Sequence, residues 1–309
     1  NIRKACEYCR DNKSTVLFFP PGLYNFRDSL ALQIEREAIS GVYGENVQGR
    51  LFKPDAPYVK ALDLFGAENL VVEAEGAILL LEGWYEVVSI DKAREVTIKG
   101  LSIVYRRPPN TVGKITKLNE GSFDMQIDPE RYFYLDKDVT GRVHYVDAMR
   151  ERLYTGGRVS GKELLSKDMI RIYTDFRPST GDFCVLRHSG HYRPAIMIKE
   201  SSDIYIEGVK IHSQPGMGVV GHLSENITLE NLQVIPEAGM IISTNTDATH
   251  FTSCKGEIVI ENCKFGGQGD DCTNIHNYYY TIVPQTKRSV EIKIQNADLH
   301  ALSLDYPDV

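Results

Sequence analysis

The chain has 309 residues, of which 42% are hydrophobic and 25% are charged, a composition typical of a globular protein. Its formal net charge of −7 argues against a non-specific nucleic-acid binder, which needs a positive surface, and mildly disfavours a strongly acidic polysaccharide as substrate. The longest aliphatic run, residues 77–81, is too short to span a bilayer, so no membrane span is expected. No signal peptide is visible, as in a mature secreted chain or a partial one.

The first elements precede any repeat. Apolar residues at helical spacing predict an amphipathic helix over residues 2–12. Cys6 and Cys9 fall on its apolar face and are interpreted as small buried residues, since no second Cys/His pair stands at zinc-finger spacing. A strand over residues 15–19 is stopped by a Pro-Pro-Gly turn. Apolar residues then alternate over residues 30–34, which is typical of another strand.

One short sequence pattern recurs through the chain. Its copies occupy residues 68–74, 94–103, 202–211, 224–234, 256–265 and, more weakly, 290–294. Each copy is a polar turn, two alternating apolar residues, a bend at a small or Asn/Gly residue, and two more alternating apolar residues. Alternation predicts strands, and Gly or Asn supplies the bend because both tolerate a positive φ. Strand-only copies at this spacing predict a parallel β-helix, whose first coil the opening helix would cap.

The period is broken between residues 103 and 195. Alternating segments at 114–118, 122–127, 131–135, 142–146, 169–173 and 181–186 predict a small antiparallel, barrel-like β domain inserted into the coils. The expected organisation is therefore all-β: coils with a capping helix over 1–105, the insertion over 106–190, and coils carrying the site over 191–309. No closing cap is visible after a last coil that is expected to reach residue 304, which favours a piece of a longer chain.

Three carboxylates are spaced by one coil. Asp247 precedes Asp270 and Asp271 by 23 and 24 residues, so stacked coils would bring them together. Close carboxylates repel, and the pKa of at least one should rise, which creates a general acid beside a general base. Glycoside hydrolysis needs such a pair. The glycine-rich stretch 266–269 would let both neighbouring aspartates reach one groove.

Other interpretations of these carboxylates remain open. Asp residues in solenoid turns commonly cap the turn with their own side chains. The three could instead bind Ca²⁺ or Zn²⁺ together with His250 or His276. A polysaccharide lyase would need Ca²⁺ and a Lys or Arg base, and no Lys lies between Lys264 and Lys287.

Polar residues around the carboxylates are candidate contacts to sugar hydroxyls. They are Arg187, His188, His212, Asn245, His250, Gln268, Asn274 and His276. Each also has a structural alternative, since such an Arg often pairs with an acid and such a His is often a satisfied groove residue.

Two segments carry a family resemblance. Residues 18–24 (Phe-Phe-Pro-Pro-Gly-Leu-Tyr) resemble the start of pectin-lyase-like right-handed β-helix proteins. Asn-Thr-Asp at 245–247, followed by Gly-Asp-Asp at 269–271, resembles the polygalacturonase family, glycoside hydrolase family 28. The later Gly-His-Gly and Arg-Ile-Lys motifs of that family are absent.

Residues 244–276 look much more like glycoside hydrolase family 110. The matching motifs are Thr-Asn-x-Asp-Ala-Thr-His-Phe at 244–251, Cys-Lys-Gly-x-Ile at 254–258 and Gly-Gln-Gly-Asp-Asp-x-x-Asn-Ile-His at 267–276. Cys272 stands where an Ala is expected. The resemblance runs over nearly the whole chain, and the antiparallel insertion fits that family.

This resemblance implies a right-handed β-helix and an exo-acting enzyme that releases terminal α-1,3-linked galactose with inversion, without a metal or cofactor. It implies that Asp247, Asp270 and Asp271 carry the acid/base chemistry, and polygalacturonase-like logic makes Asp270 the acid and the other two the water activators. The expected partner is a neutral carbohydrate, the expected location is secreted or periplasmic, and a homodimer is left open. The alternatives are a polygalacturonase-like hydrolase and a non-catalytic glycan-binding β-helix.

Overall fold

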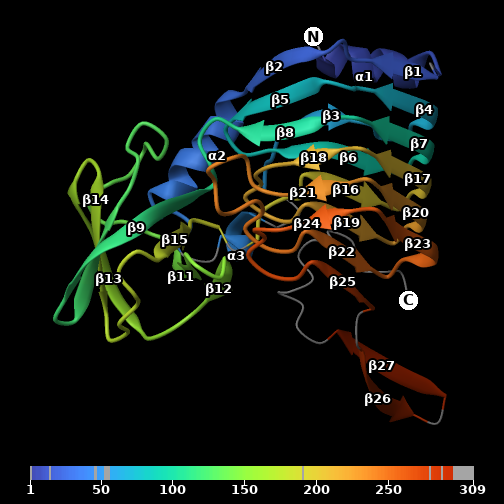
Figure 1. Ribbon diagram of the computed structural model, residues 1–309. Coiled ribbons are helices and arrows are strands. Elements are labelled where there is room, and N and C mark those ends of the chain that lie inside the picture. The colour runs from blue at the N-terminus through green and yellow to red at the C-terminus, as the bar shows by residue number, and fades with distance from the viewer. Residues whose placement is uncertain are drawn as a thin grey trace.

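Three parallel sheets of six strands each form a stack of coils (Figure 1). The computed structural model describes residues 2–13, 15–44, 47–51, 56–189, 191–277, 280–286 and 288–294. The first sheet has the order β1 (Val16–Phe18), β4 (Glu68–Glu73), β7 (Arg94–Lys99), β17 (Ser202–Glu207), β20 (Glu225–Glu230), β23 (Lys255–Glu261). The second has the order β2 (Gly22–Arg27), β5 (Ala77–Glu82), β8 (Ser102–Tyr105), β18 (Lys210–Ile211), β21 (Gln233–Val234), β24 (Lys264–Phe265). The third has the order β3 (Lys60–Asp63), β6 (Glu86–Asp91), β16 (Ile196–Lys199), β19 (Val219–His222), β22 (Thr249–Thr252), β25 (Thr273–His276).

Each sheet takes one strand from every coil, which is the architecture of a parallel β-helix. The predicted β-rich fold with parallel strands is thus confirmed. Alternate residues of the repeat point inward, so that Val72, Ile98 and Ile206 stack in a core that excludes water.

The corners of the coils carry residues with a left-handed backbone. Gly100, Gly208, Asn231 and Asn262 have φ of +70°, +62°, +54° and +53°. They are stacked, since the Gly100 N–H bonds to Glu207 O and the Gly208 N–H to Glu230 O. The bends that the sequence predicts at Gly and Asn are therefore confirmed.

Helices precede and interrupt the first coil. Helix α1 (Ile2–Asp11) confirms the helix predicted over 2–12, and Cys6 and Cys9 on it are buried against the coils. The strand predicted over 30–34 is wrong, because α2 (Ser29–Ile39) occupies those residues. Asp28 caps α2 by accepting the Leu30 N–H at 2.9 Å, and its buried residues recur at helical rather than alternating spacing. A short α3 (Gln48–Leu51) follows.

A seven-stranded antiparallel sheet lies beside the stack (Figure 1). Its order is β12 (Arg152–Tyr154), β11 (Arg142–Asp147), β15 (Phe183–Arg187), β9 (Asn110–Asn119), β10 (Ser122–Gln126), β14 (Met169–Thr174), β13 (Val159–Ser166). The strand predicted over 131–135 is wrong, since those residues form a turn and an irregular segment in which Tyr134 has a φ of +66°. β12 and β13 were not predicted, because one is very short and the other does not alternate.

The last repeat copy is not part of the stack. Residues 290–294 belong to β27 (Ser289–Ile294), which pairs antiparallel with β26 (Tyr280–Thr286). The predicted coil there is therefore wrong, and its continuation to residue 304 lies outside the described residues.

The long connections of the coils all leave the same corner, between the second and third sheets. They are residues 28–59, 106–195, 212–218, 235–248 and 266–272, while the second coil closes with 83–85 alone. The antiparallel sheet and the polar segments singled out in the sequence therefore share one edge of the stack. Among the helices of the described residues, none is long and apolar enough to cross a membrane.

Candidate active site

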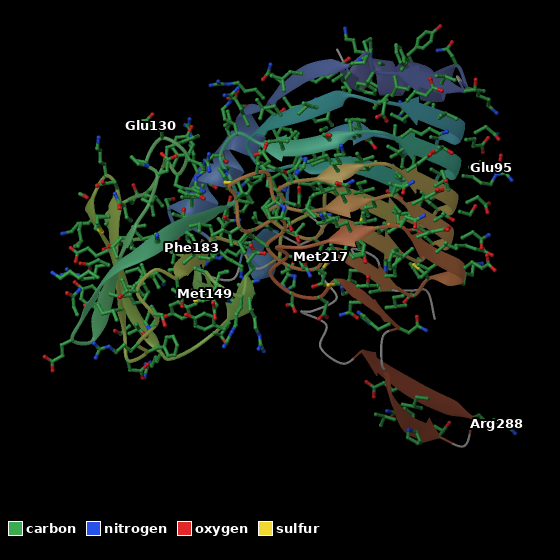
Figure 2. The ribbon with its side chains drawn as sticks, viewed as in Figure 1. Glu95, Glu130, Met149, Phe183, Met217 and Arg288 are labelled. Atoms are coloured by element: carbon green, nitrogen blue, oxygen red, sulfur yellow. The ribbon has the colours of Figure 1, made fainter. Side chains whose placement is uncertain are left out.

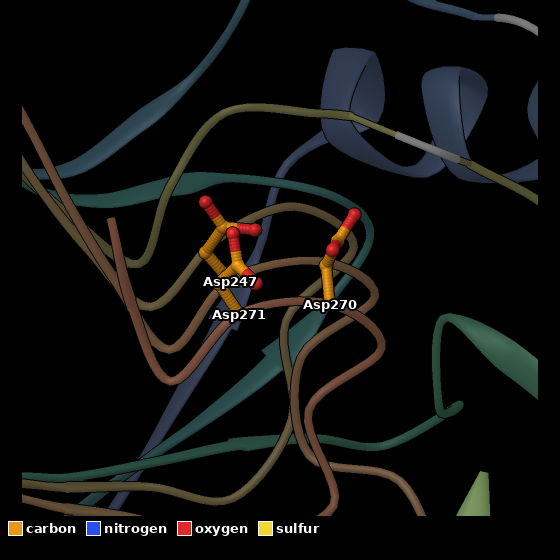
Figure 3. A group of neighbouring side chains, drawn as sticks. All are labelled: Asp247, Asp270 and Asp271. Atoms are coloured by element: carbon orange, nitrogen blue, oxygen red, sulfur yellow. The ribbon is translucent and has the colours of Figure 1, made fainter. Parts of the chain in front are cut away.

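Three carboxylates meet at this corner (Figure 3). Thr249 pairs with Thr273, so Asp247 and Asp271 occupy equivalent places in neighbouring coils, and the Ala248 N–H bonds to Asp271 O at 2.9 Å. One oxygen from each of Asp247, Asp270 and Asp271 lies within 4.8 Å of the others. Asp247 is 4% exposed, whereas Asp270 and Asp271 are exposed.

Two glycines shape the turn that carries Asp270, each for a different reason. Gly267 has φ +71°, which a side chain rarely adopts, and a Cβ there would meet Ile241 O at 2.6 Å. A Cβ on Gly269 would lie 2.4 Å from Asn245 O, so this glycine permits close stacking of the coils. Gly266 has room for a side chain.

The surroundings of Asp270 favour its protonated form. Desolvation raises the pKa of this carboxyl above 3.8, and the charges of Asp247 and Asp271 raise it further, while Arg187 and His250 oppose them. A carboxyl whose pKa is raised beside other carboxylates can donate a proton at a pH where its neighbours are ionised.

Asp247 begins a chain of contacts through two histidines. His250 Nδ1 lies 2.6 Å from Asp247 Oδ2, and His250 Nε2 lies 3.0 Å from His276 Nε2. An ionised carboxylate only accepts, so His250 Nδ1 carries the proton of the first contact. The contact between the two Nε2 atoms then needs one ring to donate and the other to accept. This series of contacts orients Asp247 and links it to the partly exposed His276.

Two further predicted contacts lie beside the carboxylates, Gln268 on the turn before β25 and Asn274 on β25 itself. Asn274 Nδ2 donates to Asp271 Oδ2 at 3.4 Å, and Gln268 Nε2 lies 2.9 Å from Cys272 Sγ. Both side chains are partly exposed beside the carboxylates.

The burial of three other predicted sugar contacts corrects that expectation. Asn245 and His188 are 0% and 1% exposed, which leaves no surface for a ligand, and Arg187, 6% exposed, donates to backbone oxygens of the coils. Asn245 donates to Ser189 O at 3.1 Å, and His188 Nε2 lies 2.8 Å from Thr111 Oγ1. Asn245 thereby joins the coils to the antiparallel sheet, whereas the contact of His188 with Thr111 lies within the insertion. His212 lies one coil before Asp247 and two coils before Asp270 and Asp271, with its Nδ1 3.0 Å from Ile235 O.

A groove of about 1230 Å³ opens between the antiparallel sheet and the corner of the stack. Asp270 and Asp271 line one wall with residues 235–242, and Phe183 and the β11–β12 turn line the other. Figure 2 shows Phe183 in the antiparallel sheet. Sequence reasoning missed this second wall, because no signal indicates which end of an insertion faces the coils.

His191 follows the insertion directly and was not among the predicted site residues, although its charge interacts with that of Asp247. Burial lowers its pKa to about 4, with Asp247 opposing and Arg187 and His250 contributing in the same direction as burial. Its place directly after the insertion was the only signal that could have suggested it.

The chain is similar to known glycoside hydrolases. The model of the family described as "Glycosyl hydrolases family 28" matches residues 182–298. Alpha-1,3-galactosidase A of Shewanella woodyi is 24% identical over 90% of this chain and 48% of its own length. Alpha-1,3-galactosidase B of Bacteroides thetaiotaomicron is 26% identical over 89% and 47%. Alpha-1,3-galactosidase A of Bacteroides fragilis is 24% identical over 89% and 48%.

These similarities confirm the resemblance that the motifs at 244–276 indicate. The chain spans about half the length of the curated relatives that it matches.

Proposed function

We propose that this chain carries the catalytic centre of an exo-acting glycoside hydrolase that releases terminal α-1,3-linked galactose with inversion. The observation that carries the proposal is the convergence of three carboxylates, of which Asp270 and Asp271 line the groove and Asp247 lies buried directly behind them. The similarity to proteins named alpha-1,3-galactosidase supports the substrate. Glycoside hydrolysis of either stereochemical course needs one protonated and one ionised carboxyl, and the raised pKa of Asp270 supports that division. One oxygen of each carboxylate lies within 4.8 Å of the others, closer than the separation of about 6.5–9.5 Å that inverting enzymes have, so inversion rests on the family resemblance and is what the anomer assay tests.

In this mechanism Asp270 protonates the glycosidic oxygen as the C–O bond to galactose breaks. Asp247 and Asp271 accept a proton from the water that attacks the anomeric carbon from the opposite face. The product is β-galactose, and Asp270 recovers its proton from solvent. Because the protonated acid and the activated water each act in the transition state, removing either should cost about 10²- to 10⁴-fold in rate.

The partly exposed polar residues beside the carboxylates are the proposed sugar contacts: His250, Gln268, Asn274 and His276. Residues 106–190 are proposed to act as an inserted subdomain that forms the far wall of the groove, on coils of right-handed sense capped by α1. No metal or cofactor enters the mechanism. The proposal includes a secreted or periplasmic location and a homodimer, which light scattering tests.

The test is a product assay on linear and fucosylated, branched α-1,3-galactosides, with NMR detection of the first anomer released. We expect β-galactose first, and Asp270→Asn and Asp271→Asn should each lower galactose release by about 10²- to 10⁴-fold. Glu257→Gln is the matched control, because Glu257 is an exposed carboxylate on β23 of the same coil.

Four outcomes would contradict the proposal. Full galactose release by both Asn variants would remove the catalytic assignment, and α-galactose as first product would indicate retention. Cleavage of polygalacturonate alone would favour the polygalacturonase-like alternative. Binding of the galactoside without any cleavage would favour a glycan-binding β-helix.

A further inference from the structure

Arg187 is a buried cation at the junction of the antiparallel sheet and the coils. It ends β15, opposite Asn110 at the start of β9, and is 6% exposed. A guanidinium removed from water is stable only where hydrogen bonds compensate for its lost hydration. The hydrogen-bond partners of Arg187 therefore show which parts of the structure this side chain fixes in place.

One nitrogen of Arg187 bridges two coils. Nη1 donates to the backbone oxygen of Asn245 and, at 3.1 Å, to that of Gly269. These residues stack one coil apart, as the Gly269 N–H bond to Thr244 O at 3.0 Å shows. Gly269 O belongs to the peptide that leads into Asp270, and Asn245 lies two residues before Asp247. The same nitrogen thus fixes the approach to two of the three carboxylates.

A second nitrogen fixes the guanidinium from the other side. Nη2 lies 2.9 Å from His144 Nε2 on β11. Arginine only donates, so Nε2 accepts and the ring is neutral. Burial, followed by the charge of Arg187, lowers the pKa of His144 to about 4, which keeps the ring neutral near pH 7.

We infer that Arg187 is a positioning residue for the acid Asp270, acting through the backbone of both turns and through its charge, and does not contact the sugar. This inference rests on the proposed function. It assigns the antiparallel sheet a part in catalysis, because the side chain that holds the turn of Asp270 comes from β15.

The charge of Arg187 acts on Asp270 with a definite sign. The charged groups that act on Asp270 are Asp247 and Asp271, which raise its pKa, and Arg187 and His250, which lower it. Those that act on Arg187 are Asp270 and Arg142. Removing the positive charge should therefore raise the pKa of Asp270 further, and the alkaline limb of the pH profile should move to higher pH.

Arg187→Met and Arg187→Lys separate geometry from charge. With the linear α-1,3-galactoside, we expect Arg187→Met to lower kcat about 10- to 100-fold through misplacement of the acid, with KM changed less than about 2-fold and the alkaline limb shifted upward. Arg187→Lys keeps the charge and loses the fork, so kcat should fall without a shift of the limb.

Arg171→Met is the matched control. Arg171 is a second arginine of the antiparallel sheet, paired with Asp124 through Nε at 2.7 Å and Nη2 at 3.0 Å. This variant should lose some stability and keep its kcat and pH profile. If Arg187→Met does not fold, Arg187→Lys and His144→Gln still test the geometry.

A carboxyl titration separates this inference from the proposed function. Asp270 is followed by ¹³C NMR in the unmodified chain and both Arg187 variants, which needs no substrate. We expect the titration midpoint of Asp270 to rise in Arg187→Met and to equal that of the unmodified chain in Arg187→Lys. A higher KM at unchanged kcat would instead assign Arg187 to sugar binding, and unchanged kcat and midpoint would make it a structural anchor only. Absence of hydrolysis by the unmodified chain, with the midpoint still shifted, would overturn the proposed function alone.

Discussion

Residues 243–249 and residues 267–273 occupy the same place in neighbouring coils, yet they differ in nearly every physical property. In the first turn almost every polar group is buried and bonded, and its Asn245 is held by the antiparallel sheet. In the second turn Asp270 and Asp271 are exposed along the groove. The difference shows that the position of a carboxylate in the repeat determines where it lies. The segments that pack on the carboxylate determine whether it is open to solvent and can exchange protons.

The largest expected effect tests the exposed turn. Asp270→Asn should lower galactose release about 10²- to 10⁴-fold and raise the free energy of unfolding at pH 7. A carboxyl whose folded pKa is raised contributes stability that is complete below its unfolded pKa and lost as pH rises through the folded one. The stability gain should therefore disappear below about pH 3.8. Thermal unfolding at both pH values checks this, and a variant less stable at pH 7 contradicts it.

The next effect compares the two turns through one residue type. Asn245→Ala leaves Ser189 O and Asn110 Nδ2 without their buried partner and should cost about 1–3 kcal/mol. Asn274→Ala, on β25 directly after the exposed turn, should change stability by less than about 0.5 kcal/mol while raising KM. Urea unfolding of both variants measures the difference. Equal losses would mean that the two turns are equally supported.

The smallest effect concerns Cys272, which is exposed and stands where the resembling family has Ala. Cys272→Ala removes only a contact with Gln268 and should change stability by less than about 0.5 kcal/mol. The value of kcat/KM should stay within about 2-fold. A larger loss, measured alongside the unmodified chain, would show that Gln268 depends on this thiol.

The coils could be predicted because their signal is local and repeated. Alternating apolar residues with Gly or Asn at each bend specify strands and corners without reference to distant parts of the chain, and the spacing of Asp247 and Asp271 follows from that repeat.

The supports of the site could not be predicted, because they join residues that are remote in sequence. Nothing around Arg187 indicates that it binds the backbone of residues 245 and 269, and nothing around Asn245 indicates a partner at residue 110. The first helix after residue 28 was also missed, since alternation of Leu30 and Leu32 masked the helical spacing of Ala31 and Ile34.

The corner between the second and third sheets takes connections of very different length, from residues 83–85 to residues 106–195, while the strands on either side keep their pairing. The length of these connections can therefore vary without a change in the pairing of the strands. Loops exchanged at this edge would remodel the groove without refolding the core, so the same stack is a platform on which recognition of different glycans can be engineered.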